Sequence, residues 1–285
     1  MESKQNPFSF YDFLGYFTPG AIFLYAVLLV FPFIQISQTE LPLISDIKQI
    51  DKLGFYIPFI LSAYVLGHLL SFLSAVTIEK YSIWTSGYPS KYLLGIKING
   101  LFTFDEPRLI RGIGRFVVIS LLLPVVIFDV IIGYGLKLRN VYSKPLDPLL
   151  LDLIKPKIEL LLNNNGNLNS KIKLDNLMSE NYFIILYHYC VEHAANHLPK
   201  MQNYVALFGF LRTLTFITVL GFWTALIVIL EMDATCPIKL ILFLCASSVC
   251  YIFYMAFTKF YRRFTFEALM AFTAVYPPTN CSDKK

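Results

Sequence analysis

Residues 53–78 read LGFYIPFILSAYVLGHLLSFLSAVTI and contain no Asp, Glu, Lys or Arg. A helix needs roughly 20 apolar residues to cross about 30 Å of hydrocarbon, whereas a long helix in a soluble protein would carry a polar face. This stretch therefore predicts a membrane-spanning helix. Three further stretches of the same character predict three more spans, at residues 13–39, 213–230 and 240–258.

The composition of the whole chain agrees with a membrane protein. Only 15% of its 285 residues are charged, where soluble domains average about 25%, and the mean hydropathy is +0.59. The net charge of +5 is too small to indicate readout of duplex nucleic acid. The five cysteines form no paired framework, so we expect no disulfides. The first apolar stretch lacks a cleavage pattern and is expected to be retained as a helix.

A fifth apolar segment, residues 116–136, is ambiguous because Pro124 interrupts it and Asp129 lies in its second half. If it does not span, 20 Lys and Arg residues lie on one side of the membrane and only three on the other. Basic residues collect on the cytoplasmic side. The charge distribution therefore favours four full spans, cytoplasmic termini, and a re-entrant or interfacial element at residues 116–136.

This topology predicts an all-α protein, a multi-spanning helical bundle with a helical cytoplasmic domain. Residues 1–76 would hold the first two spans and residues 206–258 the last two. Residues 77–205 would form the cytoplasmic region, including the apolar segment, with helices at 149–162 and 181–197 interrupted by an Asn-rich turn. Residues 259–285 would form a basic, aromatic cytoplasmic tail.

Several residues in the first two spans are candidates for a pore or a gate. Pro19 and Gly20 are expected to start or bend the first helix. In the second span, Gly67 and Ser71 lie on one helical face, and small residues there allow close helix packing. His68 lies near the middle of that span and needs a polar partner or a wet cavity. Helix packing and a pore-lining role both remain open for these residues.

Arg212 is an isolated charge near the start of the third full span. A charge at membrane depth is costly unless it is paired. Asp129 is the candidate counter-ion because it is also an isolated charge in an apolar segment, so we expect the two to interact. A structural ion pair and a permeation or gating charge are the alternatives for Arg212 and Asp129.

The sequence offers little evidence of catalysis or of a cofactor. Cys190, His193 and His197 are spaced three and four apart, so a helix would place them on one side as a weak zinc candidate. No catalytic or nucleotide-binding motif accompanies them. We therefore expect no enzyme activity and no cofactor. After the last span, Arg262, Arg263 and Glu267 are candidates for contact with anionic lipid or with the cytoplasmic domain.

Three short motifs carry a family resemblance: D-F-x-G-Y-x-x-P-G at residues 12–20, Y-x-x-G-H-x-x-S at 64–71 and R-R-F-x-x-E at 262–267. They resemble bacterial membrane proteins of anti-phage defence loci, in particular the pore-type membrane component of the Hailong system. The resemblance implies an oligomeric channel in the bacterial inner membrane. It also implies control by a soluble signalling partner, or by the nucleotide or nucleic-acid product of that partner, acting on the cytoplasmic domain.

The function expected from the sequence is thus a homo-oligomeric pore that depolarises an infected cell. No single chain of four or five such helices encloses an obvious pore, so conduction would need several copies. Two alternatives stay open. One is a small-solute transporter, which would use broken helices at mid-membrane; the other is a non-catalytic scaffold or receptor for a soluble partner.

Overall fold

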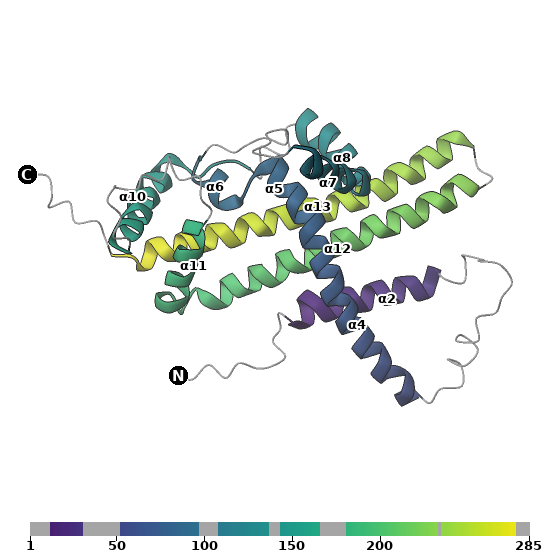
Figure 1. The fold of residues 1–285 in the computed structure, drawn as a ribbon, viewed down its shortest axis with the longest axis horizontal. Coiled ribbons are helices and arrows are strands. Elements are labelled where there is room, and N and C mark those ends of the chain that lie inside the picture. Colours follow the sequence, from purple (N-terminus) through teal and green to yellow (C-terminus); the bar gives the residue numbers. More distant parts are fainter. Residues whose placement is uncertain are drawn as a thin grey trace, which may run out of the picture. The chain divides into compact units, whose positions relative to one another are not determined.

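The fold was analysed in a computed structural model, which describes residues 12–30, 52–96, 108–136, 143–165, 181–232 and 235–277. All regular structure in these ranges is helical (Figure 1). The chain divides into two compact units. Unit 1 comprises residues 1–79 and 206–257, and unit 2 comprises residues 80–205 and 258–285.

The first described element of unit 1 is a π-helical turn, η1 (Phe13–Phe17), which continues into α2 (Thr18–Val30). Helix α4 (Lys52–Ser74) follows and ends in a second π-helical segment, η2 (Ala75–Glu79). Most of α12 (Leu198–Glu231) and the first half of α13 (Cys236–Val275) complete the unit. Figure 1 shows α2 crossing α4, and the rings of Phe222 in α12 and Phe243 in α13 meet edge to face at 5.4 Å.

The side chains of α4 are arranged as expected for a helix surrounded by lipid. Leu61, Val65, Leu69 and Phe72 recur three or four residues apart, and each is at least half exposed. Ser74, in contrast, is completely buried. Apolar surface outside and polar groups inside mark a surface that contacts membrane or a partner. The outward stripe therefore supports a membrane location for α4.

Unit 2 contains the helices that the sequence places outside the membrane, together with the ambiguous apolar segment. Its helices are α5 (Lys80–Ser86), α6 (Pro89–Leu93), α7 (Arg108–Leu121), α8 (Leu123–Phe128), η3 (Asp129–Gly135), α10 (Pro148–Asn165) and α11 (Asn181–His193). The helices predicted at 149–162 and 181–197 are thus present, although α11 ends at His193 rather than at residue 197.

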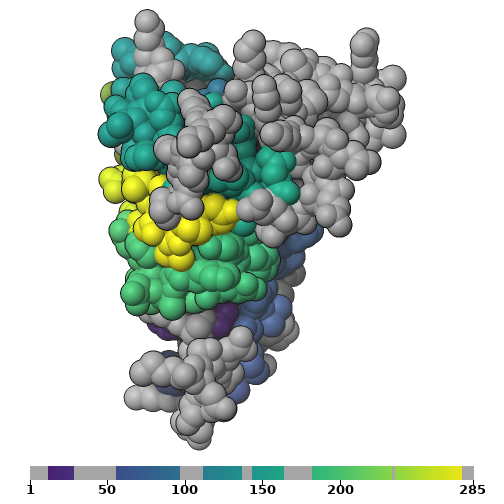
Figure 2. All heavy atoms as spheres, turned by 90° about the vertical axis from the view of Figure 1, so that its left-hand side faces the viewer, coloured from purple at the N-terminus to yellow at the C-terminus, as the bar shows by residue number. Residues whose placement is uncertain are grey.

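The core of unit 2 is built by α10, α11 and the C-terminal part of α13. Ile154 and Ile158 of α10, Leu186 of α11, and Leu269 and Phe272 of α13 are fully buried in one cluster. Figure 2 shows the yellow end of α13 next to the teal residues of α10. Lys157 donates hydrogen bonds to the carbonyl oxygens of Thr273 and Tyr276, which satisfies the open end of α13.

Among the described residues, three helices are long and apolar enough to cross a membrane: Tyr56–Leu93, Leu198–Glu231 and Cys236–Val275. A bent pair, Gly112–Leu121 and Leu123–Gly135, would make a fourth if it formed one span, but its two parts meet at 84°. Phe13–Leu28 is a shorter apolar helix. The predicted first span extends to residue 39, and its part beyond residue 30 lies outside the described residues. A multi-pass, all-helical membrane protein is therefore supported.

Candidate functional site

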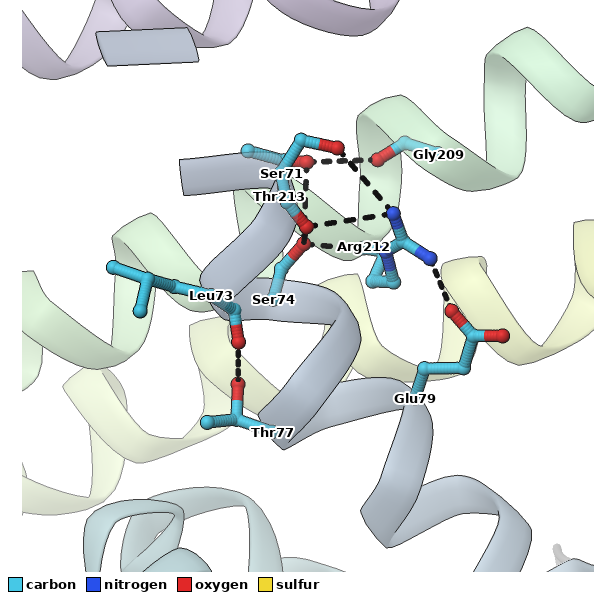
Figure 3. A network of polar contacts seen from close by, with 8 residues as sticks. All are labelled: Ser71, Leu73, Ser74, Thr77, Glu79, Gly209, Arg212 and Thr213. Carbon is cyan, nitrogen blue, oxygen red and sulfur yellow. Dashed lines mark hydrogen bonds and ion pairs between the residues drawn. The ribbon is translucent and has the colours of Figure 1, made fainter. Parts of the chain in front are cut away.

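Arg212 is the centre of a polar network inside unit 1 (Figure 3). Its Nη1 forms an ion pair with Glu79 Oε2. Its Nε donates to Ser74 Oγ at 3.2 Å, and its Nη2 lies 3.4 Å from Ser71 Oγ and 3.5 Å from the Ser71 carbonyl oxygen. The Arg212 side chain is 13% exposed and that of Glu79 is 23% exposed. Two opposite charges are therefore held together within a mostly apolar bundle.

The hydroxyl groups around Arg212 are oriented by their own helices. Ser74 donates to the Ser71 carbonyl oxygen at 2.7 Å, which leaves its lone pairs facing Arg212 Nε. Thr213 donates to the Gly209 carbonyl oxygen at 3.0 Å, and its Oγ1 lies 3.4 Å from Ser74 Oγ. These hydrogen bonds within each helix orient the hydroxyl oxygens of Ser74 and Thr213 independently of Arg212. The arrangement gives Arg212 contacts on all three of its nitrogen atoms.

The π-helical segment η2 explains why Glu79 can reach this network. In a regular α-helix a residue five positions after Ser74 would be rotated by about 140° from it. A π-helical turn closes i to i+5 hydrogen bonds and is wider, so position 79 returns towards the face of Ser74. Such turns occur frequently at functional sites. The polar network thus depends on an irregularity in the backbone of the second span.

The expected pairing of Arg212 with Asp129 is corrected by this geometry. Arg212 has its counter-ion in unit 1, at Glu79. Asp129 lies in unit 2, is 1% exposed, and its Oδ2 accepts a hydrogen bond from Tyr81 at 2.9 Å. Sequence reasoning missed Glu79 because it follows the apolar run directly and was assigned to the polar region outside the span. Its position five residues after Ser74 indicates a shared face only if the π turn is known.

Gly20 and Gly67 lie where η1 and α2 cross α4. A Cβ atom added at Gly20 would overlap the carbonyl oxygen of Ala63, and one added at Gly67 would overlap that of Tyr16. The two helix backbones are therefore in direct contact, as small residues permit in membranes. Pro19 is buried beside this contact and occupies the second position of α2, where the π turn passes into the α-helix.

His68 is exposed and makes ring contacts with two tyrosines. Its ring stacks on Tyr16 at 3.9 Å between centroids and meets the edge of Tyr64 at 4.6 Å. Of the residues singled out in the second span, Ser71 belongs to the Arg212 network, Gly67 to the helix crossing, and His68 to this aromatic cluster. The face that the sequence assigns to Gly67 and Ser71 thus serves two different contacts, and His68 makes a third.

A second polar cluster lies in unit 2, around Glu267 of α13. Glu267 is 7% exposed, and its Oε2 forms an ion pair with Lys200 Nζ at 2.8 Å. His197 Nδ1 lies 3.2 Å from the other carboxylate oxygen. Arg262 donates to the Lys144 carbonyl oxygen at 3.1 Å, while Arg263 is exposed. Arg262 and Glu267 therefore join the end of α13 to other elements of its own unit.

Cys190, His193 and His197 each have separate surroundings. Cys190 is fully buried, its Sγ lies 3.5 Å from the Ala268 carbonyl oxygen, and burial raises the pKa of its thiol to about 12. His193 stacks on Tyr189 at 4.3 Å, and His197 contacts Glu267. A metal needs the thiolate form of cysteine. In the described part of the chain, no group of three or more His, Cys, Asp or Glu side chains is placed to hold a metal.

No family model, curated protein or solved structure matches the chain.

Proposed function

We propose that the chain is the subunit of a homo-oligomeric membrane channel whose opening is controlled through unit 2. The observation that carries the proposal is the Arg212–Glu79 pair and its ring of hydroxyl groups inside apolar helices. Ionisable residues within membrane helices are expensive and usually mark ion pathways, relays or sensors. A plain membrane anchor has no need of such a pair.

The position of the pair along the chain fits control through unit 2. Unit 1 consists of two segments, residues 1–79 and 206–257, and Glu79 is the last residue of the first segment. Arg212 lies six residues, or about 9 Å of helix, after Ala206, where the second segment begins. The chain passes between the units at residues 79/80, 205/206 and 257/258, and each of these positions is helical. A signal arriving on unit 2 would therefore reach the ion pair through helices rather than through loops.

The setting of this channel is also part of the proposal. We place both termini and unit 2 on the cytoplasmic side of a bacterial inner membrane, with four spans, because 20 basic residues then lie inside. The resemblance of the motifs at residues 12–20, 64–71 and 262–267 to pore-type effectors is the basis for proposing a role in anti-phage defence. In that role a soluble partner, or a nucleotide or nucleic-acid product of it, would release the closed channel and depolarise the cell.

A small-solute transporter is the second candidate, favoured by the bent pair in unit 2. Transporters place substrate sites at discontinuous helices. Here α7 and the following limb, α8–η3, meet at 84°. The buried Asp129 is the first residue of η3. Saturable uptake of one solute, with no current, would favour this candidate over the channel.

The proposed topology predicts that unit 2 is inaccessible from outside the cell. With the native cysteines replaced, a single cysteine at the exposed position Asp152 of α10 should resist a membrane-impermeant maleimide in intact cells and react after permeabilisation. A cysteine at Met232, between α12 and α13, should react in intact cells and serves as the control. Labelling of the position 152 cysteine in intact cells would contradict the four-span topology.

The channel proposal predicts ion flux. Purified protein in liposomes with an ion-sensitive dye should conduct, and expression without a regulator should collapse the membrane potential of bacterial cells. Ser71→Ala and His68→Leu should change the flux more than Ile227→Ala, which alters an exposed apolar side chain of α12. Ser71→Ala retains both charges of the ion pair. Absence of flux in every condition, with all variants equal to wild type in toxicity, would favour the scaffold instead.

A further inference from the structure

The helix α7 has basic and apolar residues on opposite sides. Its sequence, RLIRGIGRFVVISL, places Arg108, Arg111 and Arg115 three and four residues apart, and it contains no acidic residue. Successive positions in an α-helix are about 100° apart, so these three positions share one side. Ile113, Phe116 and Val117 fall on the other side. A short, basic, amphipathic helix of this kind is typical of helices that lie in a membrane interface.

The apolar side of α7 is the open side within unit 2. Ile113, Phe116 and Val117 are 59%, 70% and 58% exposed. The guanidinium of Arg115 lies over the ring of Trp84 in α5, at 5.3 Å from its centroid. Arg115 therefore contacts α5 of the same unit, whereas the exposed apolar side needs another partner to leave water.

The bend after α7 decides how the two limbs can meet a bilayer. Pro124 follows the break at Leu122, and the limb α8–η3 leaves at 84° to α7. When two limbs are nearly perpendicular, one can follow the membrane normal only if the other lies in the membrane plane. The amphipathic limb is α7, whereas α8–η3 carries Asp129 as its one charged residue and exposes Val130 and Ile131.

The lengths of the two limbs also indicate that α7 lies in the membrane plane and that α8–η3 does not cross the bilayer. The 14 residues of α7 extend about 21 Å, and the residues of α8 and η3 extend a similar distance of about 20 Å. The hydrocarbon core is about 30 Å thick. Neither limb is long enough to cross alone, and the bend prevents them from adding.

We propose that α7 lies flat in the cytoplasmic leaflet, bound to anionic phospholipid through Arg108 and Arg111, while α8–η3 dips into the bilayer without crossing it. Arginines near an anionic leaflet are attracted to it, and the attraction falls within a Debye length. This inference does not depend on ion conduction.

Depth measurements on the full-length protein in nanodiscs test the orientation of α7. Single cysteines at positions 113, 116, 117 and 131, in a chain without its native cysteines, would carry a fluorophore quenched by doxyl lipids. We expect equal, shallow depths at 113 and 117 and a greater depth at 131. If α7 ran along the normal, 113 and 117 would differ by about 6 Å. That result, or quenching by aqueous iodide with no effect of doxyl lipid, would overturn the inference.

The lipid preference is tested in the same preparation. Replacing part of the phosphatidylcholine with phosphatidylglycerol should increase lipid quenching at position 116. Arg108→Gln with Arg111→Gln should remove most of this increase, while the exposed Lys144→Gln should retain it. An increase that persists in the double variant would overturn the role of the arginines. Protection of 113, 116 and 117 from both quenchers, with cross-links between copies, would assign the face to a second copy. Neither test measures membrane potential. A failure of the inference about α7 is therefore distinguishable from a failure of the channel proposal.

Discussion

Arg212→Met is expected to destabilise the protein by an amount near the lower end of the roughly 3–5 kcal/mol seen when one partner of a buried ion pair is removed. The substitution leaves the Glu79 carboxylate with 23% of its side chain exposed, and leaves Ser74 Oγ without its Nε donor. An uncompensated charge in an apolar bundle costs more than the pair contributes. Partial exposure of Glu79 reduces the cost below that of a fully buried pair.

The measurement is the folded fraction remaining after graded heating in detergent, compared across a double-mutant cycle. Glu79→Gln should also destabilise, and the double variant Glu79→Gln with Arg212→Met should lose clearly less than the sum of the single variants. Lys239→Met is the matched control, because its Nζ donates only to an exposed carbonyl oxygen of Leu230. Additive single effects would show that the two charges contribute independently.

The same cycle links stability to the proposed channel. If the pair holds unit 1 in a closed state, variants that break it should conduct without any activating signal, provided they still assemble. If the pair is only structural, the variants should lose stability and remain as impermeable as wild type. The flux assay on protein that survives purification separates these outcomes, because stability and conductance are then measured on the same sample.

Much of the architecture could be predicted from apolar runs and from the polar, helix-breaking residues between them. The apolar runs at residues 53–78, 213–230 and 240–258 all lie within long helices. Helices α10 and α11 lie almost where the sequence places them, because a polar turn separates two periodic segments. These features depend on local sequence, which hydrophobic periodicity reports directly.

The lengths of α12 and α13 were not predictable in the same way. Helix α12 begins at Leu198, before the apolar run, and α13 continues to Val275, well beyond it. The added residues of α13 are stabilised by tertiary packing, since Ala268, Leu269 and Phe272 are fully buried in the core of unit 2. Such packing is not visible in a scan for membrane-length apolar windows.

The polar site was only half predictable. Arg212 and Ser71 stand out because they are polar in apolar runs, but the partner Glu79 depends on the π turn at Ala75–Glu79. Asp129 was assigned to Arg212 because both are isolated charges, whereas its hydrogen bond comes from Tyr81, 48 residues earlier in the chain. Nothing in residue spacing identifies that partner. Pairing across a bundle is set by helix arrangement, which one sequence does not contain.

Gly67→Ala is expected to separate η1 from α4 and to destabilise unit 1 by at least the roughly 1–3 kcal/mol typical of overpacking. The added methyl group would overlap the backbone carbonyl oxygen of Tyr16, and no rotamer change can move a backbone atom. Gly20→Ala should have a comparable effect, because its methyl group would overlap the carbonyl oxygen of Ala63. Thermal unfolding in detergent provides the measurement.

The control for this prediction is supplied by glycines of α12. A Cβ atom at Gly209 or Gly221 meets nothing within 4 Å, so alanine there should be neutral or stabilising by about 0.5–1 kcal/mol through its better helix propensity. The two pairs of variants make the same chemical change in helices of the same unit, and they differ only in what the methyl group meets. The sign of the effect should therefore reverse between them. Equal stability of Gly67→Ala and Gly221→Ala would mean that η1 and α4 do not touch at this crossing. The stacking of Tyr16 on His68 at 3.9 Å, which depends on the same crossing, would then lose its basis.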